Sequence, residues 1–169
     1  MLLVAVLGLR IGEAVAVKFS DFVDGVLHVS RRLYEGDVDD LKTRRSERDL
    51  PVPPALMARI EQLGPGDWVF RSRTGTPVNP GNALKRVIRP VPKNSALNSE
   101  GWHDFRHTLS TMMRRNKVHP KVISGTLGHV KVEFTSEVYD HTSVEEMRDP
   151  LVAIADQLLP TVTKTKSVK

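Results

Sequence analysis

The sequence contains no cysteine, and only 5% of its 169 residues are aromatic. Without cysteine there are no disulfides, no thiolate nucleophile, no thiol redox chemistry, and no zinc or iron–sulfur site that depends on a Cys ligand. Any metal site would rest on histidine and carboxylates alone. The scarcity of aromatic residues argues against the stacking platforms on which proteins usually hold single-stranded nucleic acids.

Long hydrophobic segments are lacking as well. The chain opens with an apolar run over residues 1–9, and nine residues are too few to span a bilayer. No basic segment precedes this run, as a secretory signal peptide would require. We therefore interpret it as a core segment of a cytoplasmic protein that makes no membrane contact.

The charge balance is basic, with 25 Lys and Arg against 20 Asp and Glu and a formal net charge of +5. A hydrophobic content of 40% is enough for a packed core, and the length fits one domain. A basic chain that is poor in aromatic residues indicates the phosphate backbone of DNA as the partner.

Hydrophobic spacing and capping residues predict a mainly α-helical domain with a small antiparallel β-sheet. Gly8 interrupts the apolar stretch up to residue 17, which predicts two short helices around a turn. Residues 24–52 alternate in the manner of strands, with a turn expected at 37–40. Further helices are expected over residues 54–63, 79–89, 103–116, 120–127, 133–139 and 143–159. We assign residues 1–160 to this domain and residues 161–169 to a flexible basic tail.

Four short clusters carry residues suited to chemistry, and each also has an ordinary structural explanation. Arg10 and Glu13 share a face at the start of the second helix, where the arginine is either a solvated cap or a partner for the carboxylate. Lys42 stands in a charged run near the expected hairpin, and such a run is most often a solvated face. His129 follows a Leu-Gly pair, where it would complement a helix dipole. Tyr139 is one of two tyrosines and is ordinarily a core or boundary residue.

The remaining cluster, third along the chain, begins with His103 and Arg106, which are three residues apart and so lie on one face near a helix N-terminus. Free N–H groups favour an anion at that position, but local sequence alone favours a helix-start histidine and a surface arginine that makes a salt bridge. His103 and His107 have the spacing of the metalloprotease helix. That motif needs Glu directly after the first histidine, and Asp104 stands there instead, so the pattern does not favour zinc or another metal.

The order and spacing of these clusters resemble the catalytic domain of the tyrosine recombinase (phage integrase) family. The shared pattern is an Arg, a hairpin Lys, His-x-x-Arg, Leu-Gly-His and a Tyr ten residues later, and it covers residues 8–142. The resemblance places the six active-site residues of the family at Arg10, Lys42, His103, Arg106, His129 and Tyr139.

The chemistry of DNA strand cleavage accounts for these residue types. Breaking a phosphodiester concentrates negative charge on its non-bridging oxygens, which Arg10 and Arg106 can bind bidentately while staying charged. A phenol with a pKa of about 10 is a strong enough nucleophile and a good enough leaving group for a reversible reaction. Tyr139 would therefore become a phosphotyrosine.

The remaining residues supply protons and orientation. Lys42 suits the role of general acid for the departing 5′-hydroxyl if neighbouring cations lower its pKa. His103 can relay the phenolic proton, and His129 can donate a hydrogen bond to a phosphate oxygen. Glu13 would orient Arg10 or a histidine. Because the bond energy is stored in the protein–DNA link, no ATP, metal or other cofactor is required.

The resemblance implies site-specific DNA recombination through a 3′-phosphotyrosyl intermediate. Its partners would be double-stranded DNA, further protomers in a DNA-bound tetramer, and directionality factors. Two alternatives stay open: a DNA-binding remnant that no longer cleaves, and a type IB topoisomerase-like activity, although His129 and its short spacing to Tyr139 favour the recombinase. The candidates for contact with the DNA backbone are Arg44, Arg45, Arg48, Lys85 and Arg86.

The two ends of the chain carry further expectations. In the family a DNA-clamping domain and additional catalytic-domain helix precede the first arginine, whereas Arg10 lies ten residues from the start here, so we expect a fragment without the clamp domain. Near the other end, Leu151, Ile154, Ala155 and Leu158 form an apolar stripe. This helix either covers the core of its own domain or packs into a neighbouring protomer. We expect the isolated chain to be monomeric, with weak, salt-sensitive affinity for DNA.

Overall fold

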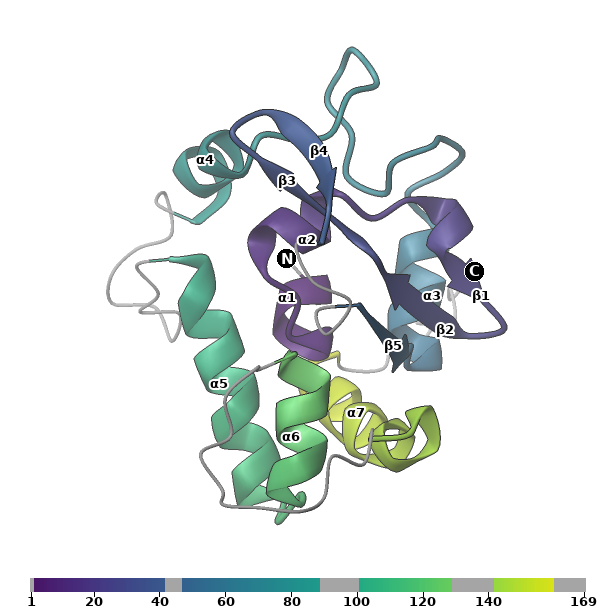
Figure 1. Cartoon of the computed structure of the whole chain (residues 1–169), viewed down its shortest axis with the longest axis vertical. Helices are drawn as coiled ribbons and strands as arrows, with labels where there is room; N and C mark the ends of the chain where they lie inside the picture. The colour runs from purple at the N-terminus through teal and green to yellow at the C-terminus, as the bar shows by residue number, and fades with distance from the viewer. Residues whose placement is uncertain (1, 42–46, 89–100, 129–141, 160–169) are drawn as a thin grey trace, which may run out of the picture.

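A computed structural model describes residues 2–41, 47–88, 101–128 and 142–159 of the chain (Figure 1). The helices are α1 (Leu2–Leu7), α2 (Ile11–Val15), α3 (Pro54–Glu61), α4 (Pro80–Ala83), α5 (Trp102–Arg115), α6 (Pro120–Leu127) and α7 (Val144–Leu158), with a 3-10 turn η1 (Phe19–Asp21) and a π-helical turn η3 (Leu84–Ile88). The strands are β1 (Phe22–Val23), β2 (Val26–Val29), β3 (Arg31–Tyr34), β4 (Asp37–Asp40) and β5 (Arg48–Pro51). Figure 1 shows α5, α6 and α7 gathered at one end of the molecule and the strands toward the other, with α1 between them. The prediction of a mainly helical domain with a small antiparallel sheet is confirmed.

The first two helices meet at a turn that only glycine fits. Gly8 has a φ of +66°, and a Cβ at this position would lie 2.7 Å from the Leu127 side chain and 2.9 Å from the Leu109 side chain. The predicted pair of short helices around Gly8 is therefore confirmed. Because the turn packs directly against α5 and α6, Arg10 just after it is brought to the end of α6, where it contacts Gly128.

The strands form two antiparallel sheets, one ordered β1–β2–β5 and the other a β3–β4 hairpin. The turn expected at residues 37–40 is wrong, because these residues form strand β4. The chain reverses instead at Glu35 and Gly36, whose φ values are +50° and +102°. Aspartates are poor strand formers, but the register sets Asp39 and Asp40 opposite arginines of β3, and opposite charges across a strand pair are stabilising.

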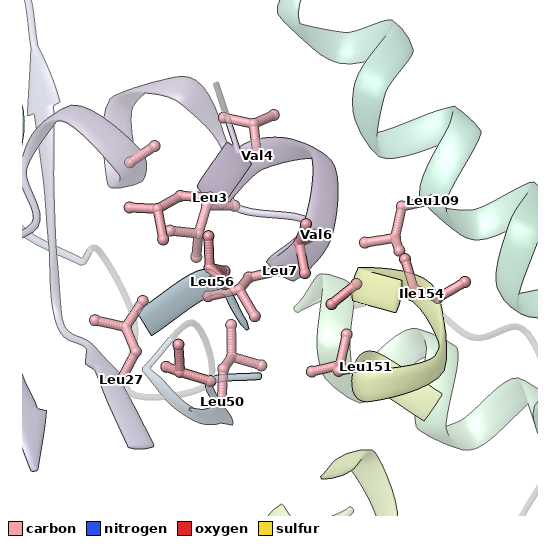
Figure 2. Close-up of a cluster of buried hydrophobic side chains, with 14 of the residues drawn as sticks. Leu3, Val4, Val6, Leu7, Leu27, Leu50, Leu56, Leu109, Leu151 and Ile154 are labelled. Carbon is pink, nitrogen blue, oxygen red and sulfur yellow. The ribbon is translucent and has the colours of Figure 1, made fainter. Parts of the chain in front are cut away.

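A single hydrophobic core joins the helical end to the larger sheet. Figure 2 shows side chains of α1, α3, α5 and α7 meeting those of β2 and β5. The labelled members are Leu3, Val4, Val6, Leu7, Leu27, Leu50, Leu56, Leu109, Leu151 and Ile154, all 1% exposed or less.

Helix α7 packs onto this core within its own chain. Leu151, Ile154 and Ala155 are fully buried, and α7 contacts β5, α1, α3, α5 and α6. The helix begins with a capping box, in which the Glu146 backbone N–H donates to Ser143 Oγ at 3.2 Å and the Ser143 N–H donates to Glu146 Oε2 at 2.8 Å. Of the two placements expected for this helix, the structure shows the one that covers its own domain.

The other predicted helices mostly begin where capping residues indicated. Asn79 Oδ1 accepts hydrogen bonds from the backbone N–H groups of Gly81 and Asn82, at 2.9 and 3.1 Å, and so caps α4. The chain then continues as the π-helical turn η3 rather than as one regular helix. Helix α6 has the predicted bounds, and α5 differs from its prediction by one residue at each end. The helix expected at 133–139 lies outside the described residues.

Candidate functional site

A buried carboxylate, that of Glu13, lies at the centre of a cluster of arginines. Glu13 is 2% exposed, and its carboxylate accepts hydrogen bonds from the backbone N–H of Arg10 at 2.8 Å and from Arg10 Nη1 at 2.9 Å. Arg48 Nη2 donates to the same carboxylate at 2.8 Å. Burial raises the pKa of Glu13, but the Arg48 charge and the hydrogen bonds from both arginines outweigh it, so the net pKa lies below its usual value. Glu13 is therefore ionised at neutral pH.

Arg48 enters this cluster from strand β5. Its side chain is 7% exposed, and its Nε donates to the backbone carbonyl of Thr126 at 3.1 Å, near the end of α6. We expected Arg48 at the surface, in contact with the DNA backbone, and the structure corrects that placement. A buried, ionised Glu13 needs a cationic partner, and Arg48 is that partner inside the protein.

Arg106 comes from α5 and is also buried, with 4% of its surface exposed. Its Nη1 donates to the Gly8 carbonyl, and its Nη2 donates to the Leu127 carbonyl at 2.8 Å. Its Nε has no hydrogen-bond partner among the described residues. Burial, helped by the charges of Arg10 and Arg48 and opposed by that of Glu13, lowers the pKa of Arg106 to about 10. The guanidinium still carries its charge at neutral pH, and one N–H of each Nη is already used by a backbone carbonyl.

The ends of two helices explain why arginines gather here. The last carbonyls of a helix have no partner within the helix and carry the negative end of its dipole, so cationic side chains are stabilised beside them. Gly8 directly follows α1, and Leu127 is the last residue of α6. Gly128, in the left-handed region with a φ of +61°, turns its carbonyl to accept from Arg10 Nη2 at 3.2 Å.

Arg10 differs from the other two arginines because its side chain is 46% exposed although it is held at two points. Nη1 donates to Glu13 and Nη2 donates to the Gly128 carbonyl. A guanidinium that is fixed on one side and open to solvent on the other can bind an anion that arrives from outside.

His103 lies in the first turn of α5 and is exposed, whereas Arg106 on the following turn is buried. The expected shared face therefore opens to solvent only at the histidine. The rings of His103 and His107 are in edge contact, with 4.6 Å between their centroids. Within the described ranges, His103 is not hydrogen-bonded to the arginine cluster, and no group of three or more His, Asp or Glu side chains is placed to hold a metal ion.

The remaining predicted site residues fall into two groups. Lys85 and Arg86 are exposed on η3, where a contact with DNA is sterically open. Outside the described residues lie Lys42, Arg44, Arg45, His129 and Tyr139.

Sequence reasoning missed the internal role of Arg48, although the strand pattern contained a signal for it. Side chains two apart on a strand point to the same face, and Leu50 of β5 is fully buried. Arg48 shares that face, while Asp49 between them is exposed and its Oδ1 accepts from His28 Nδ1 at 2.6 Å. An arginine on the buried face of a strand needs an internal anion, and Glu13 is that anion.

A sequence model of the phage integrase family matches residues 1–146. A tyrosine recombinase XerC-like protein of Caldanaerobacter subterraneus subsp. tengcongensis is 24% identical over 182 residues, covering 88% of this chain and 46% of that protein. Transposase A from transposon Tn554 of Staphylococcus aureus is 28% identical over 157 residues, covering 84% of this chain and 42% of the transposase. The chain thus spans less than half the length of these two relatives.

Solved structures with a similar fold include integrases bound to DNA. The Tn1549 transposon integrase in complex with a circular intermediate DNA superposes with a TM-score of 0.63 at 18% identity, covering 93% of this chain and 57% of that one. A λ integrase dimer bound to a core site has a TM-score of 0.54 at 22% identity, covering 82% of this chain and 52% of that one. At these identities the likeness shows the shared fold. Within the described segments, the helices all fall short of the length and apolar character that a membrane span needs.

Proposed function

Since this chain belongs to the phage integrase family and has the fold of its catalytic domain, we propose that it cleaves and rejoins DNA strands through a 3′-phosphotyrosyl intermediate. The observation that carries the proposal is the geometry of Arg10. Its guanidinium is anchored by Glu13 and by the Gly128 carbonyl, yet remains 46% exposed beside the segment that leads to His129. An anchored, accessible cation is what a scissile phosphate requires.

The proposed reaction is a transesterification that conserves bonds. The hydroxyl oxygen of Tyr139 attacks the phosphorus, its proton passes to His103, and the bond from phosphorus to the 5′-oxygen breaks. Lys42 protonates the departing 5′-oxygen. Religation runs the same steps in reverse, with a 5′-hydroxyl as nucleophile and the tyrosine as leaving group.

Two arginines would stabilise the charge that develops on the phosphate. Arg10 approaches from the solvent side, and Arg106 lies beneath it with both Nη atoms on backbone carbonyls. After these two bonds Arg106 keeps further N–H groups, the second hydrogen of each Nη and Nε–H, and the Nε is buried without a partner among the described residues. His129 would donate a further hydrogen bond to a phosphate oxygen.

The proposed substrate is double-stranded DNA. The similar solved structures are integrases in complex with DNA, and the net charge of +5 suits a phosphate backbone. Lys85 and Arg86 are the exposed cations of η3 that we propose contact it. We also propose that the active assembly contains further protomers in a DNA-bound tetramer and responds to directionality factors.

The decisive experiment traps the covalent intermediate. The chain is incubated with duplex DNA that carries a nick near the cleavage site or a 5′-bridging phosphorothiolate, and products are separated on a denaturing gel. We expect a covalent band with the wild type and none with Tyr139→Phe, while non-covalent DNA affinity changes by no more than a few fold.

The matched control is Tyr34→Phe, since Tyr34 is the other tyrosine of the chain and is 52% exposed on β3. This variant should form the adduct at the wild-type rate. An adduct that persists in Tyr139→Phe would refute the assignment of the nucleophile. DNA binding without any adduct in the wild type would instead show a DNA-binding remnant that no longer cleaves.

A further inference from the structure

Arg48 is the arginine of the cluster that the reaction scheme leaves without a role. It is too deeply buried to reach a DNA phosphate, because only 7% of its side chain is exposed. Its guanidinium bonds to Glu13, which is 35 positions earlier, and to the Thr126 carbonyl, which is 78 positions later. In sequence it stands six residues after Lys42, at the start of β5.

We propose that Arg48 is a positioning residue for strand cleavage, which holds the Glu13 carboxylate and through it the Arg10 guanidinium in register with the end of α6. This inference rests on the proposed function. It assigns to Arg48 no contact with DNA and no proton transfer.

The first argument is the way the carboxylate is shared. Oε1 of Glu13 accepts from Arg10 Nη1 at 2.9 Å and from Arg48 Nη1 at 3.4 Å, and Oε2 accepts from Arg48 Nη2 at 2.8 Å and from the Arg10 backbone N–H at 2.8 Å. A two-pronged contact from Arg48 fixes the plane of the carboxylate. Without it, the donors to Glu13 that remain in this set all belong to Arg10, the N-cap residue of the same short helix.

The second argument is that Arg10 and Arg48 both contact the end of α6. A Cβ added to Gly128 would lie 2.9 Å from Arg48 Nη1 and 3.1 Å from its Cζ, so the guanidinium packs against the Gly128 backbone. The carbonyl of this glycine accepts from Arg10 Nη2 at 3.2 Å. Glu13, Arg48, the end of α6 (residues 126–128) and Arg10 therefore form a closed ring of contacts, which the loss of Arg48 breaks.

The third argument concerns charge. The groups that face Glu13 are Arg10 at the start of α2, Arg48 from β5 and Arg106 from α5. Burial favours the protonated form of Glu13, and the charge of Arg48 is the largest influence in the opposite direction. Removal of that charge should raise the pKa of Glu13, and a protonated Glu13 holds Arg10 less firmly.

The test compares Arg48→Met and Arg48→Lys with a control, Arg148→Met. Arg148 also pairs with a glutamate but is 42% exposed and lies outside the cluster. Single-turnover adduct formation is measured from about pH 5 to pH 8, alongside DNA affinity and the melting temperature.

We expect Arg48→Met to lower the rate of adduct formation about 10- to 100-fold while DNA affinity changes little, the usual effect of losing a group that orients another. Arg48→Lys should be slow as well, because one ammonium cannot span both carboxylate oxygens and the Thr126 carbonyl. The rate of Arg48→Met should fall further as the pH is lowered, and a second change, Glu13→Gln, should remove that pH dependence. Arg148→Met should match the wild type.

Three results would overturn the proposal: a loss of DNA affinity as large as the loss of rate, full activity in Arg48→Lys, or a pH profile of Arg48→Met identical to that of the wild type. If the wild type itself forms no adduct, the proposed function fails. The positioning role is then tested without DNA, by NMR. The arginine side-chain ¹⁵N NMR signals of Arg10, assigned with Arg10→Ala, should show restricted rotation in the wild type and free rotation in Arg48→Met. Unchanged signals would refute the inference independently of cleavage.

Discussion

Two glutamate–arginine pairs of similar geometry lie in opposite surroundings in this protein. Glu13 accepts from Arg48 at 2.8 Å with side-chain exposures of 1% and 7%, and Glu145 accepts from Arg148 at 3.1 Å with exposures of 76% and 42%. Each glutamate has a pKa below its usual value. For Glu145 the cause is the hydrogen bond and charge of Arg148 in solvent, whereas for Glu13 the arginines act against the opposing effect of burial.

The comparison shows that contact distance is a poor guide to what an ion pair does. Around Glu145, water solvates either partner when the other is removed, and the pair joins residues one turn apart on α7. Around Glu13, water is excluded, and the pair joins α2 to β5. Only the buried pair can transmit a constraint from one element to another.

The largest expected difference between the two pairs is in folding stability. Glu13→Ala leaves Arg48 and Arg106 buried without their anion, and breaking a buried pair in this way costs about 3–5 kcal/mol. The free energy of unfolding, measured with urea, should drop by that amount. Glu145→Ala is the control and should leave the urea midpoint unchanged within error. Comparable losses in both variants would mean that Glu13 is solvated in solution.

A smaller difference should appear in acid. The folded pKa of Glu13 is below its unfolded value of 4.5, so its contribution is complete above pH 4.5 and is lost as the pH falls through the folded pKa. Urea midpoints measured from neutral pH downward should therefore fall less steeply below pH 4.5 in Glu13→Gln than in the wild type. Glu145→Gln should follow the wild-type slope closely. A Glu13→Gln slope identical to that of the wild type would contradict the assigned direction.

The smallest expected effect is that of salt on the coupling within each pair. Double-mutant cycles with Glu145→Gln and Arg148→Met should give a weak coupling at low salt that disappears at high salt, because exposed charges are screened. The corresponding cycle for Glu13 and Arg48 should give a coupling that survives high salt. If salt removed the coupling of the buried pair, its shielding from solvent would have to be rejected.

Much of the local structure could be predicted along the chain. The capping box at Ser143 and Glu146, the Asn79 cap and the break at Gly8 each depend on neighbouring residues and were recognised from them. The turn expected at 37–40 was wrong because three aspartates within four residues are typical of a loop. Their strand form is explained by the arginines that the register places opposite Asp39 and Asp40, a pairing between strands.

The candidate site likewise contains contacts between neighbouring residues and contacts between distant ones. Arg10 is the N-cap residue of α2 and Glu13 lies three residues on, so their contact follows from local spacing at a helix start, and the sequence offered it as one of two explanations for Arg10. The positions of Lys42, His129 and Tyr139 were likewise recognised as a pattern in the sequence, and their roles stay predictions. Spacing along a backbone carries this kind of information because neighbouring residues have few ways to be arranged.

The contacts of Arg48 and Arg106 join residues that are far apart in the sequence. Arg106 reaches the Gly8 carbonyl across 98 positions and the Leu127 carbonyl across 21, and Arg48 reaches Glu13 across 35. None of these partners follows from local spacing, because each depends on how α1, α5, α6 and β5 pack around the common core. Packing excludes water from these charges. A buried arginine is stable only when a carboxylate or backbone carbonyl of the protein replaces that water, and the tertiary structure decides which group does so.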